Sequence, residues 1–360
     1  MKRRMRPALA FTTVMAALAA GCATAPRPLH ARALALQAAG VEALGRGQLD
    51  RAAGHFALAL EYEPRIGEAE NGLGLVALRR GDWARAEERF HAALAINEDL
   101  AEAHLNLATV LVHRDEEAAA LGEARAALAI DPGYADARLL TAELLLQIGK
   151  LDDARWELEK LCAAAPDRAD VHAANALVLA RLGRTSAAEE EARRALELDA
   201  DLPAAHRARA EILRRAGDLE AASRELDVVI ASNAAAIDDR LAHAVVAAGR
   251  GLWSDAAREL EALLEAAPRR PEVRFAAAFV ALARNEREAA LRAADAALAL
   301  RAHYPEARLV RAEALSRLGR DAEMRHELDL FLAEAPPRMA TERARAERML
   351  RARSTLLEIQ

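Results

Sequence analysis

Small, apolar and turn-forming residues recur along the chain at one fixed step, which is the step from Gly47 to Gly81. The most regular column holds glycine in seven of its nine positions, and Asp and Asn in the other two, which tolerate a positive φ better than most residues. A residue of this kind closes one helix before the next one starts. The column therefore predicts left-handed turns at Gly47, Gly81, Asp115, Gly149, Gly183, Gly217, Gly251, Asn285 and Gly319.

Two further columns of small residues flank this turn. Alanine stands five residues after it in eight units, and Ala or Gly stands seven residues before it in all nine. Small side chains on both sides predict two antiparallel helices that approach each other closely. A mainly leucine column lies thirteen residues after the turn and contains Cys162, which we predict to be a buried apolar thiol without a functional role. Prolines four positions later, as at Pro64 and Pro132, are expected to end the second helix.

This pattern resembles the tetratricopeptide repeat, a helix–turn–helix unit of about 34 residues. The resemblance covers nine consecutive units between residues 33 and 338. It implies an all-α fold, a right-handed superhelical α-solenoid of about nine repeats. The fourth position of each unit, often aromatic in the family, is here mostly His or Arg, so smaller side chains are expected to fill the interior. Each unit buries its apolar face only against its neighbours, and the ends therefore need caps. Residues 339–360, dense in Arg and Glu, are the predicted C-terminal capping helix.

The N-terminus has the pattern of a secretory signal. Basic residues precede an uncharged run from Ala8 to Ala20, which is too short to span a bilayer. The following LAAGC, Leu18 to Cys22, resembles the lipobox of bacterial lipoprotein precursors. This resemblance implies a signal peptide over residues 1–21, a lipidated Cys22 and a short tether over residues 22–32. Ala23 after the cysteine favours the periplasmic face of the outer membrane over the inner membrane. The alternative is an ordinary signal peptide cut near Ala20, which leaves Cys22 a plain thiol.

Composition and motifs exclude several function classes. The net charge is −6, falling to about −10 without residues 1–21, and aromatic residues make up 3% of the chain. An acidic chain with few aromatics argues against a nucleic-acid partner. None of the common hydrolase, metalloprotease or nucleotide-binding motifs is present, and the repeats leave no room for a catalytic domain. We therefore expect a protein that is not an enzyme and uses no cofactor.

Two columns of polar residues invite a sharper interpretation. His104, His172 and His206 share one column, but zinc needs three or four convergent ligands, and no second column of Cys or His completes a set. We therefore predict no metal site and expect partly exposed polar side chains on a helix face. Acidic residues occupy the second position of seven units. A cationic ligand in an acidic groove is conceivable, although carboxylates in the first turn of a helix are expected from the helix dipole alone.

The first helix of each unit lines the concave groove in the repeat family. Carried onto this sequence, the resemblance places an apolar patch in the last three units beside a basic patch in units five and six. This arrangement favours a helix or extended peptide of a partner protein with both apolar and acidic groups. The alternative is that neighbouring units or the capping helix bury Phe275 and Phe279. The predicted groove residues are Arg207, Arg214, Leu241, Val245, Phe275, Phe279, Leu282 and Leu309.

The function expected from these features is that of a membrane-anchored, periplasm-facing scaffold for protein partners. Lipoproteins of this build resemble those that assist pilus or secretin assembly or that dock cell-wall enzymes, and architecture alone does not select among them. Two alternatives stay open: an envelope enzyme or metal-dependent activator that uses the histidine column, and a structural homo-oligomer that mates through Phe275 and its neighbours. The sequence does not define the oligomeric state.

Overall fold

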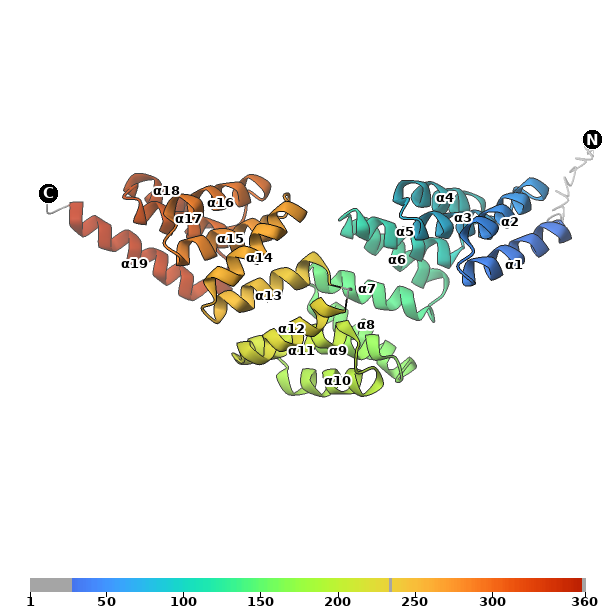
Figure 1. Ribbon diagram of the computed structural model, residues 1–360, viewed down its shortest axis with the longest axis horizontal. Helices are drawn as coiled ribbons and strands as arrows, with labels where there is room; N and C mark the ends of the chain where they lie inside the picture. Colours follow the sequence, from blue (N-terminus) through green and yellow to red (C-terminus); the bar gives the residue numbers. More distant parts are fainter. Residues whose placement is uncertain (1–27, 233–234, 358–360) are drawn as a thin grey trace, which may run out of the picture. The chain divides into compact units, whose positions relative to one another are not determined.

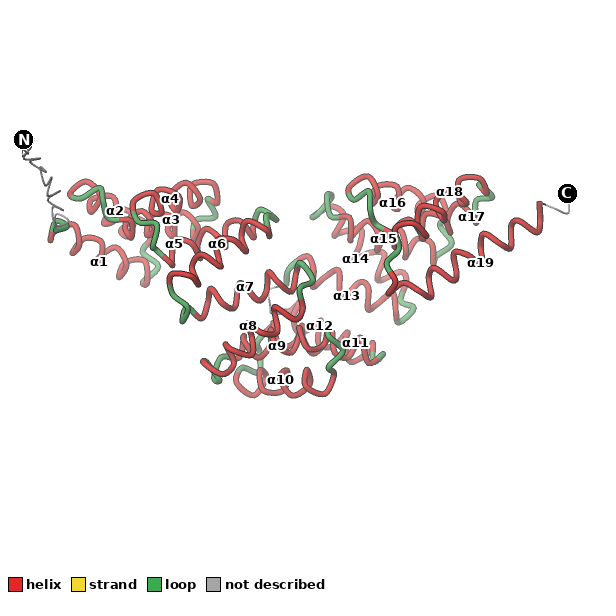
Figure 2. The backbone as a smooth tube through the Cα atoms, turned by 180° about the vertical axis from the view of Figure 1, so that it is seen from behind, coloured by secondary structure: helices red, strands yellow, loops and turns green. Residues whose placement is uncertain are grey.

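The computed structural model describes residues 28–232 and 235–357, with side chains up to residue 351. In these ranges every regular element is a helix, and no strand is present (Figure 2). The predicted signal peptide, Cys22 and the first part of the tether lie outside the described residues. Two compact units divide the chain at Val110 and Leu111, within one helix, and each unit is described by itself.

The first unit is built from antiparallel helices of thirteen to fifteen residues (Figure 1). These helices are α1 (Ala31–Gly45), α2 (Leu49–Tyr62), α3 (Gly67–Arg79), α4 (Trp83–Ile96) and α5 (Ala101–His113), the last of which crosses the boundary.

The second unit continues the same alternation of a first and a second helix. Its helices are α6 (Glu117–Ile130), α7 (Ala135–Gln147), α8 (Leu151–Ala164), α9 (Ala169–Arg181), α10 (Thr185–Leu198), α11 (Pro203–Ala216), α12 (Leu219–Ala231), α13 (Ile237–Gly249), α14 (Trp253–Ala266), α15 (Pro271–Ala283), α16 (Arg287–Leu300), α17 (Pro305–Arg317), α18 (Asp321–Glu334), the 3₁₀ turn η1 (Pro337–Met339) and α19 (Ala340–Leu357). The helices from α1 to α18 form nine helix–turn–helix pairs, which confirms the predicted fold class.

The turn inside each pair has the predicted left-handed backbone. All nine residues of the turn column have a positive φ, between 59° at Asp115 and 86° at Gly217. The residue after the turn donates its N–H to a carbonyl five residues earlier, as from Gln48 to Ala43 and from Arg320 to Leu315. This 6→1 bond is the Schellman arrangement, which satisfies a carbonyl left free at a helix end. Each pair is therefore closed locally by its own sequence.

The core consists mainly of alanine. The column five residues after the turn is completely buried in all nine units, from Ala52 to Met324. Leu and Val are the commonest of the larger buried side chains, and Phe56, Phe90 and Phe331 are the largest that are fully buried. Short side chains bring the two helices of a pair together and leave the outward faces to charged residues.

α19 covers the apolar side of the last pair. Met339 and Ala346 are buried in one cluster with Leu328 and Phe331 of α18. Arg343 donates from Nη1 to the carbonyl oxygens of Leu332 and Ala335, at 2.7 and 2.9 Å, and so satisfies carbonyls at the end of α18. The segment is helical as expected, and it acts as a lid on the apolar face of the last repeat.

Candidate functional site

An apolar hollow of about 400 Å³ lies on the face formed by α13 and α15, in the second of the two compact parts of the chain. We call it the phenylalanine hollow. Its lining includes Leu241, Val245, Glu272, Phe275, Phe279 and Tyr304. Four of these are predicted groove residues, Leu241 and Val245 from α13 and Phe275 and Phe279 from α15. The structure therefore brings together side chains from two different units, because they occupy equivalent positions in successive first helices.

The aromatic side chains of this hollow differ in exposure. Phe279 is 47% exposed and Val245 45%, and the Phe279 ring tilts against Trp253 with centroids 6.3 Å apart. Phe275 is half-buried and packs on the buried Tyr304, 5.3 Å between centroids. The hollow has therefore a fixed inner wall and an accessible outer edge. Such an edge can accept apolar side chains of another molecule, since their contact removes Phe279 and Val245 from water.

Two predicted groove residues do not reach this surface. Leu282 is 4% exposed and Leu309 7% exposed, and both belong to the core around Leu315 and Phe331. The position of Leu282 is buried in other units too, as at Leu44 and Leu146, so it belongs to the core of the repeat. Leu282 and Leu309 support the hollow from behind and do not line it.

The two predicted basic groove residues hold carboxylates of the same chain. Arg207 donates from Nε and Nη2 to both oxygens of Asp239, at 2.6 and 2.9 Å, and Asp239 is 5% exposed. Arg214 donates from Nε and Nη2 to Glu211, at 2.8 and 2.9 Å, and this hydrogen bond raises the pKa of the Arg214 guanidinium. Because both guanidinium groups already hold carboxylates, the expectation of a partner with acidic groups loses its basis.

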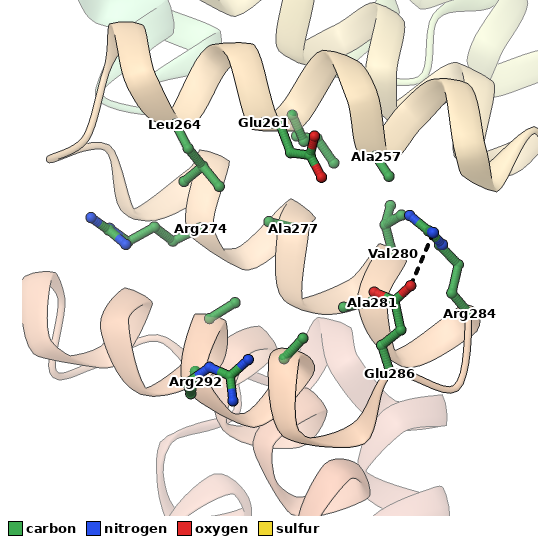
Figure 3. Close-up of a pocket in the computed structure, with 13 residues that line it drawn as sticks. Ala257, Glu261, Leu264, Arg274, Ala277, Val280, Ala281, Arg284, Glu286 and Arg292 are labelled. Carbon is green, nitrogen blue, oxygen red and sulfur yellow. Dashed lines mark ion pairs between the residues drawn. The ribbon is translucent and has the colours of Figure 1, made fainter.

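A second hollow of about 310 Å³ lies between α14, α15 and α16 (Figure 3). Its floor consists of small and aliphatic side chains such as Ala277, Val280 and Ala281, and charged side chains surround it. Arg284 and Glu286 at its edge form an ion pair of 3.0 Å. None of the described residues that line this hollow is aromatic, so it offers less surface to an apolar ligand than the phenylalanine hollow does.

The side chains of the histidine column make structural contacts within the chain. His206 places Nδ1 2.7 Å from Glu225 Oε2 and Nε2 3.1 Å from the Ala200 carbonyl oxygen. Arg138 and Arg308 occupy the same column, and each bonds a carboxylate 19 residues later and a carbonyl six residues earlier. The expected partly exposed side chains are found at His104 and His206, whereas His172 is 8% exposed. The side chains of this column connect the loop before their unit to the second helix of that unit.

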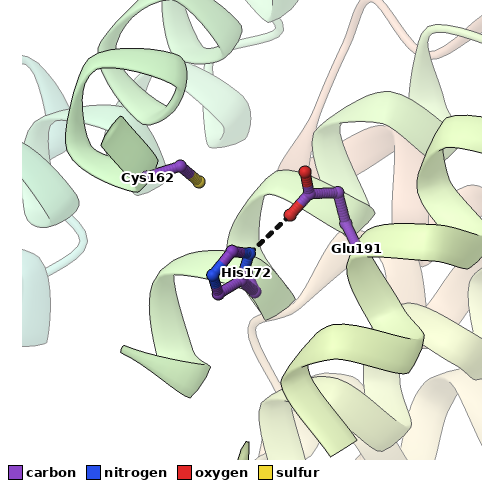
Figure 4. Close-up of side chains that lie close together, drawn as sticks. All are labelled: Cys162, His172 and Glu191. Carbon is purple, nitrogen blue, oxygen red and sulfur yellow. Dashed lines mark hydrogen bonds and ion pairs between the residues drawn. The ribbon is translucent and has the colours of Figure 1, made fainter. Parts of the chain in front are cut away.

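Cys162 lies beside the equivalent histidine–glutamate contact of the fifth repeat. His172 of α9 places Nδ1 2.6 Å from Glu191 Oε2 of α10, and the Cys162 sulfur of α8 lies close to both (Figure 4). One ligand atom from each residue lies within 4.8 Å of the others. Cys162 is half-buried, and this burial, with the nearby charge of Glu191, raises the pKa of its thiol to about 12. Sequence columns did not predict this cluster, because its members stand in three different columns.

Acidic residues at the second position of the units serve in helix starts and ion pairs. All seven lie in the first turn of a helix. Arg168 donates to Asp136 at 2.6 Å and Arg270 to Asp238 at 2.7 Å, each from the loop before the next unit. The carboxylates are therefore accounted for by helix dipoles and pairs between units. Within the described ranges, no helix combines the length and hydropathy needed to cross a bilayer.

Comparison with known proteins agrees with this geometry. Profiles of the tetratricopeptide repeat match residues 38–97 and 72–135, and another profile of the same repeat matches residues 115–178. Residues 38–178 belong to the tetratricopeptide-repeat family. No curated protein sequence matches this chain.

Solved structures share the fold of this chain. A tetratricopeptide repeat protein from Parabacteroides merdae ATCC 43184 has a TM-score of 0.53 and 16% identity, over 70% of this chain and 99% of that one. The APC/C hetero-tetramer Cut9–Hcn1 gives a TM-score of 0.60 and 13% identity, over 78% of this chain and 55% of that one. A structure of Pseudomonas aeruginosa pilF is 24% identical, with a TM-score of 0.43, over 59% of this chain and 97% of that one.

Proposed function

We propose that this chain is a non-catalytic scaffold that binds an apolar segment of a partner protein in the phenylalanine hollow. The observation that carries the proposal is the exposed edge formed by Phe279 and Val245 above a wall of Leu241 and Phe275. Exposed large apolar side chains around one hollow are typical of a binding surface.

The charges around the hollow define the partner further. Glu272 is the charged residue in its lining, and its carboxylate pairs with Arg301. The nearest predicted cations, Arg207 and Arg214, hold Asp239 and Glu211. A partner segment therefore gains most by inserting apolar or aromatic side chains, as one face of a helix or alternate residues of an extended peptide do.

The experiment uses a photoreactive residue in place of Phe279 in cells, with mass spectrometry of the crosslinked partner. Phe279→Ala and Val245→Ala, tested singly and together, should reduce recovery of that partner without loss of helix content. Phe275 is left intact, because its contact with Tyr304 supports the fold. Trp156→Ala is the matched control, since Trp156 is equally exposed, at 53%, but does not line the hollow.

Equal recovery of the partner by Phe279→Ala, Trp156→Ala and the parent chain would reject the hollow as the binding site. A crosslink to a second copy of this chain, together with a dimer in light scattering, would instead support the structural homo-oligomer.

We propose further that Cys22 carries the lipid that anchors the scaffold to the periplasmic face of the outer membrane. The LAAGC pattern and the basic and apolar segments before it support this proposal. Service in envelope, pilus or secretion assembly, or as an adaptor for cell-wall enzymes, belongs to the same proposal. Cys22→Ala should release the protein from the membrane fraction and leave an uncleaved precursor. Unchanged membrane binding and migration would overturn the anchor and leave the scaffold proposal intact.

A further inference from the structure

The side chains of Cys162, His172 and Glu191 converge where the fourth unit meets the fifth. Cys162 belongs to α8, the second helix of the fourth unit, while His172 and Glu191 belong to the two helices of the fifth. Their sulfur, nitrogen and oxygen atoms lie within 4.8 Å of one another (Figure 4). Thiolate, imidazole and carboxylate are the ligand types that zinc takes in proteins.

The hydrogen bonds of His172 fix how its ring is presented. Nε2 lies 2.9 Å from the carbonyl oxygen of Pro166, which only accepts, so Nε2 carries a hydrogen. Nδ1 then faces Glu191 Oε2 at 2.6 Å, which as a carboxylate oxygen is also an acceptor. Two acceptors at this distance require a cation between them, either a proton or a metal ion. A ring that donates its other N–H to a carbonyl is the usual orientation of a histidine that binds metal.

A fourth polar group is aimed at the same place. Asn175 of α9 is 4% exposed, and its amide nitrogen Nδ2 lies 3.8 Å from Cys162 Sγ. Its Oδ1 is buried without a hydrogen-bond partner. A buried amide oxygen without a partner is costly. Because the two ends of an amide have the same shape, exchanging them by a flip of the group directs Oδ1 to the sulfur side of the cluster.

The thiol of Cys162 and the amide of Asn175 both occur beside the same His–Glu pair, and the next unit has neither. In the next unit His206 and Glu225 form the same pair, but Leu196 stands in the column of Cys162 and Arg209 in that of Asn175. Across the nine units the cysteine column otherwise holds Leu or Ile. Packing alone explains neither the thiol nor the amide, since aliphatic residues also occur in both columns.

We propose that Cys162 Sγ, His172 Nδ1, Glu191 Oε and Asn175 Oδ1 bind one zinc-class divalent cation that ties the fourth unit to the fifth. Bond lengths of about 2.0–2.3 Å place tetrahedral ligands about 3.3–3.8 Å apart, so side-chain shifts of about 1 Å assemble the site. On binding, the thiol proton and the proton between Nδ1 and Glu191 leave to solvent, and four metal–ligand bonds replace them.

Nucleophilic catalysis by the same cluster is a poorer fit. The raised pKa of the thiol keeps Cys162 protonated and unreactive at neutral pH. A bound cation supplies the positive charge that holds the sulfur as a thiolate beside Glu191.

The test titrates Zn²⁺ into the full chain by calorimetry and records the absorption spectrum of the Co²⁺ form. All proteins carry Cys22→Ser, so that Cys162 is the sole thiol. The parent should bind one ion per chain and show a sulfur-to-cobalt charge-transfer band. Cys162→Leu, the residue of its own column, should keep the fold, lose the band and lower affinity by at least about a hundredfold, beyond the effect of losing an outer contact.

Two further variants separate ligation from structure. His172→Arg retains a cation for Glu191, as Arg138 does for Glu157, and should abolish metal binding with little change in thermal stability. His206→Arg makes the equivalent change one unit later and should leave metal binding intact. A parent chain that takes up no zinc would overturn the proposal. Zinc uptake that survives Cys162→Leu, or that falls equally in His206→Arg, would do so as well.

Discussion

The ring of Phe90 occupies the space that a Cβ atom on Gly74 would need. A Cβ built at Gly74 stands 2.4 Å from Cε1 of Phe90, and Gly40 stands in the same relation to Phe56 at 2.5 Å. In the fourth unit the same two positions hold Ala142 and Leu158. The glycine–phenylalanine pair and the alanine–leucine pair of the fourth unit therefore fill nearly the same volume between the helices.

Gly74→Ala should therefore destabilise the first of the two compact parts of the chain, although alanine favours the helical conformation more than glycine does. The clash costs about 1–3 kcal/mol, and the gain in helix propensity offsets about 1 kcal/mol. Phe90→Leu alone leaves a void, but the double change reproduces the pair of the fourth unit. Urea unfolding followed by circular dichroism should show the double variant more stable than the sum of the single effects predicts. Strict additivity of the two changes would contradict this packing relationship.

Arg207→Ala should cost more stability than Arg214→Ala, although both arginines hold carboxylates. Asp239 is buried, and without Arg207 it keeps the backbone N–H of Ala236 at 2.8 Å as a donor. We expect a loss of about 2–4 kcal/mol in the free energy of unfolding. Glu211 retains Arg215 at 2.6 Å when Arg214 is removed, so that loss should stay below about 1 kcal/mol. Thermal and urea unfolding measure the loss of unfolding free energy in each variant. Equal losses would contradict the conclusion that Asp239 is a buried partner of Arg207.

His243 should make stability fall as the pH rises above about 6.5, the pKa of histidine in the unfolded chain. Its Nδ1 lies 2.8 Å from Glu259 of α14, and its Nε2 lies 3.3 Å from Asp227 of α12. The hydrogen bond to Glu259 is the main cause that raises the pKa of His243, Asp227 adds to it, and burial and Arg250 act in the opposite direction. A raised pKa in the folded state contributes stability that is fully present below the unfolded value of about 6.5. This stability is lost as the pH rises through the folded pKa.

The measurement compares the parent with His243→Gln at several pH values. The difference in unfolding free energy should be largest below about pH 6.5 and should shrink as the pH rises above it. A difference that does not change with pH, or that grows as the pH rises, would contradict the raised pKa of His243.

The repeat columns predicted those parts of the molecule that depend on local sequence. The turn at Gly47 and its equivalents follows from the φ that one residue adopts, and the helix pairs follow from the small residues beside it. Leu241, Val245, Phe275 and Phe279 were predicted to share one face because they hold equivalent positions in a regular stack, and they line one hollow. Whether a partner binds there stays a prediction.

What the columns missed depends on contacts between different positions of the repeat. Arg207 finds Asp239 32 residues away, and this pairing removes the basic patch that single positions predicted. Leu282 and Leu309 lie in the core, although the resemblance placed their positions on the groove surface. The group of Cys162 and His172 forms only once the second helix of one unit packs on the first helix of the next. Pairs of columns, compared unit by unit, would have been the signal for the ion pair and for the cysteine group.

The way α19 seats itself on the last pair has a consequence for assembly. In a stack of identical modules, the exposed flank of the terminal module has the right shape to receive another module, and copies with open flanks tend towards linear polymers. Here Met339 and Ala346 occupy that flank, and Arg343 consumes the carbonyls at the end of α18. Growth by addition at this end is therefore blocked, and any association between copies must use another surface.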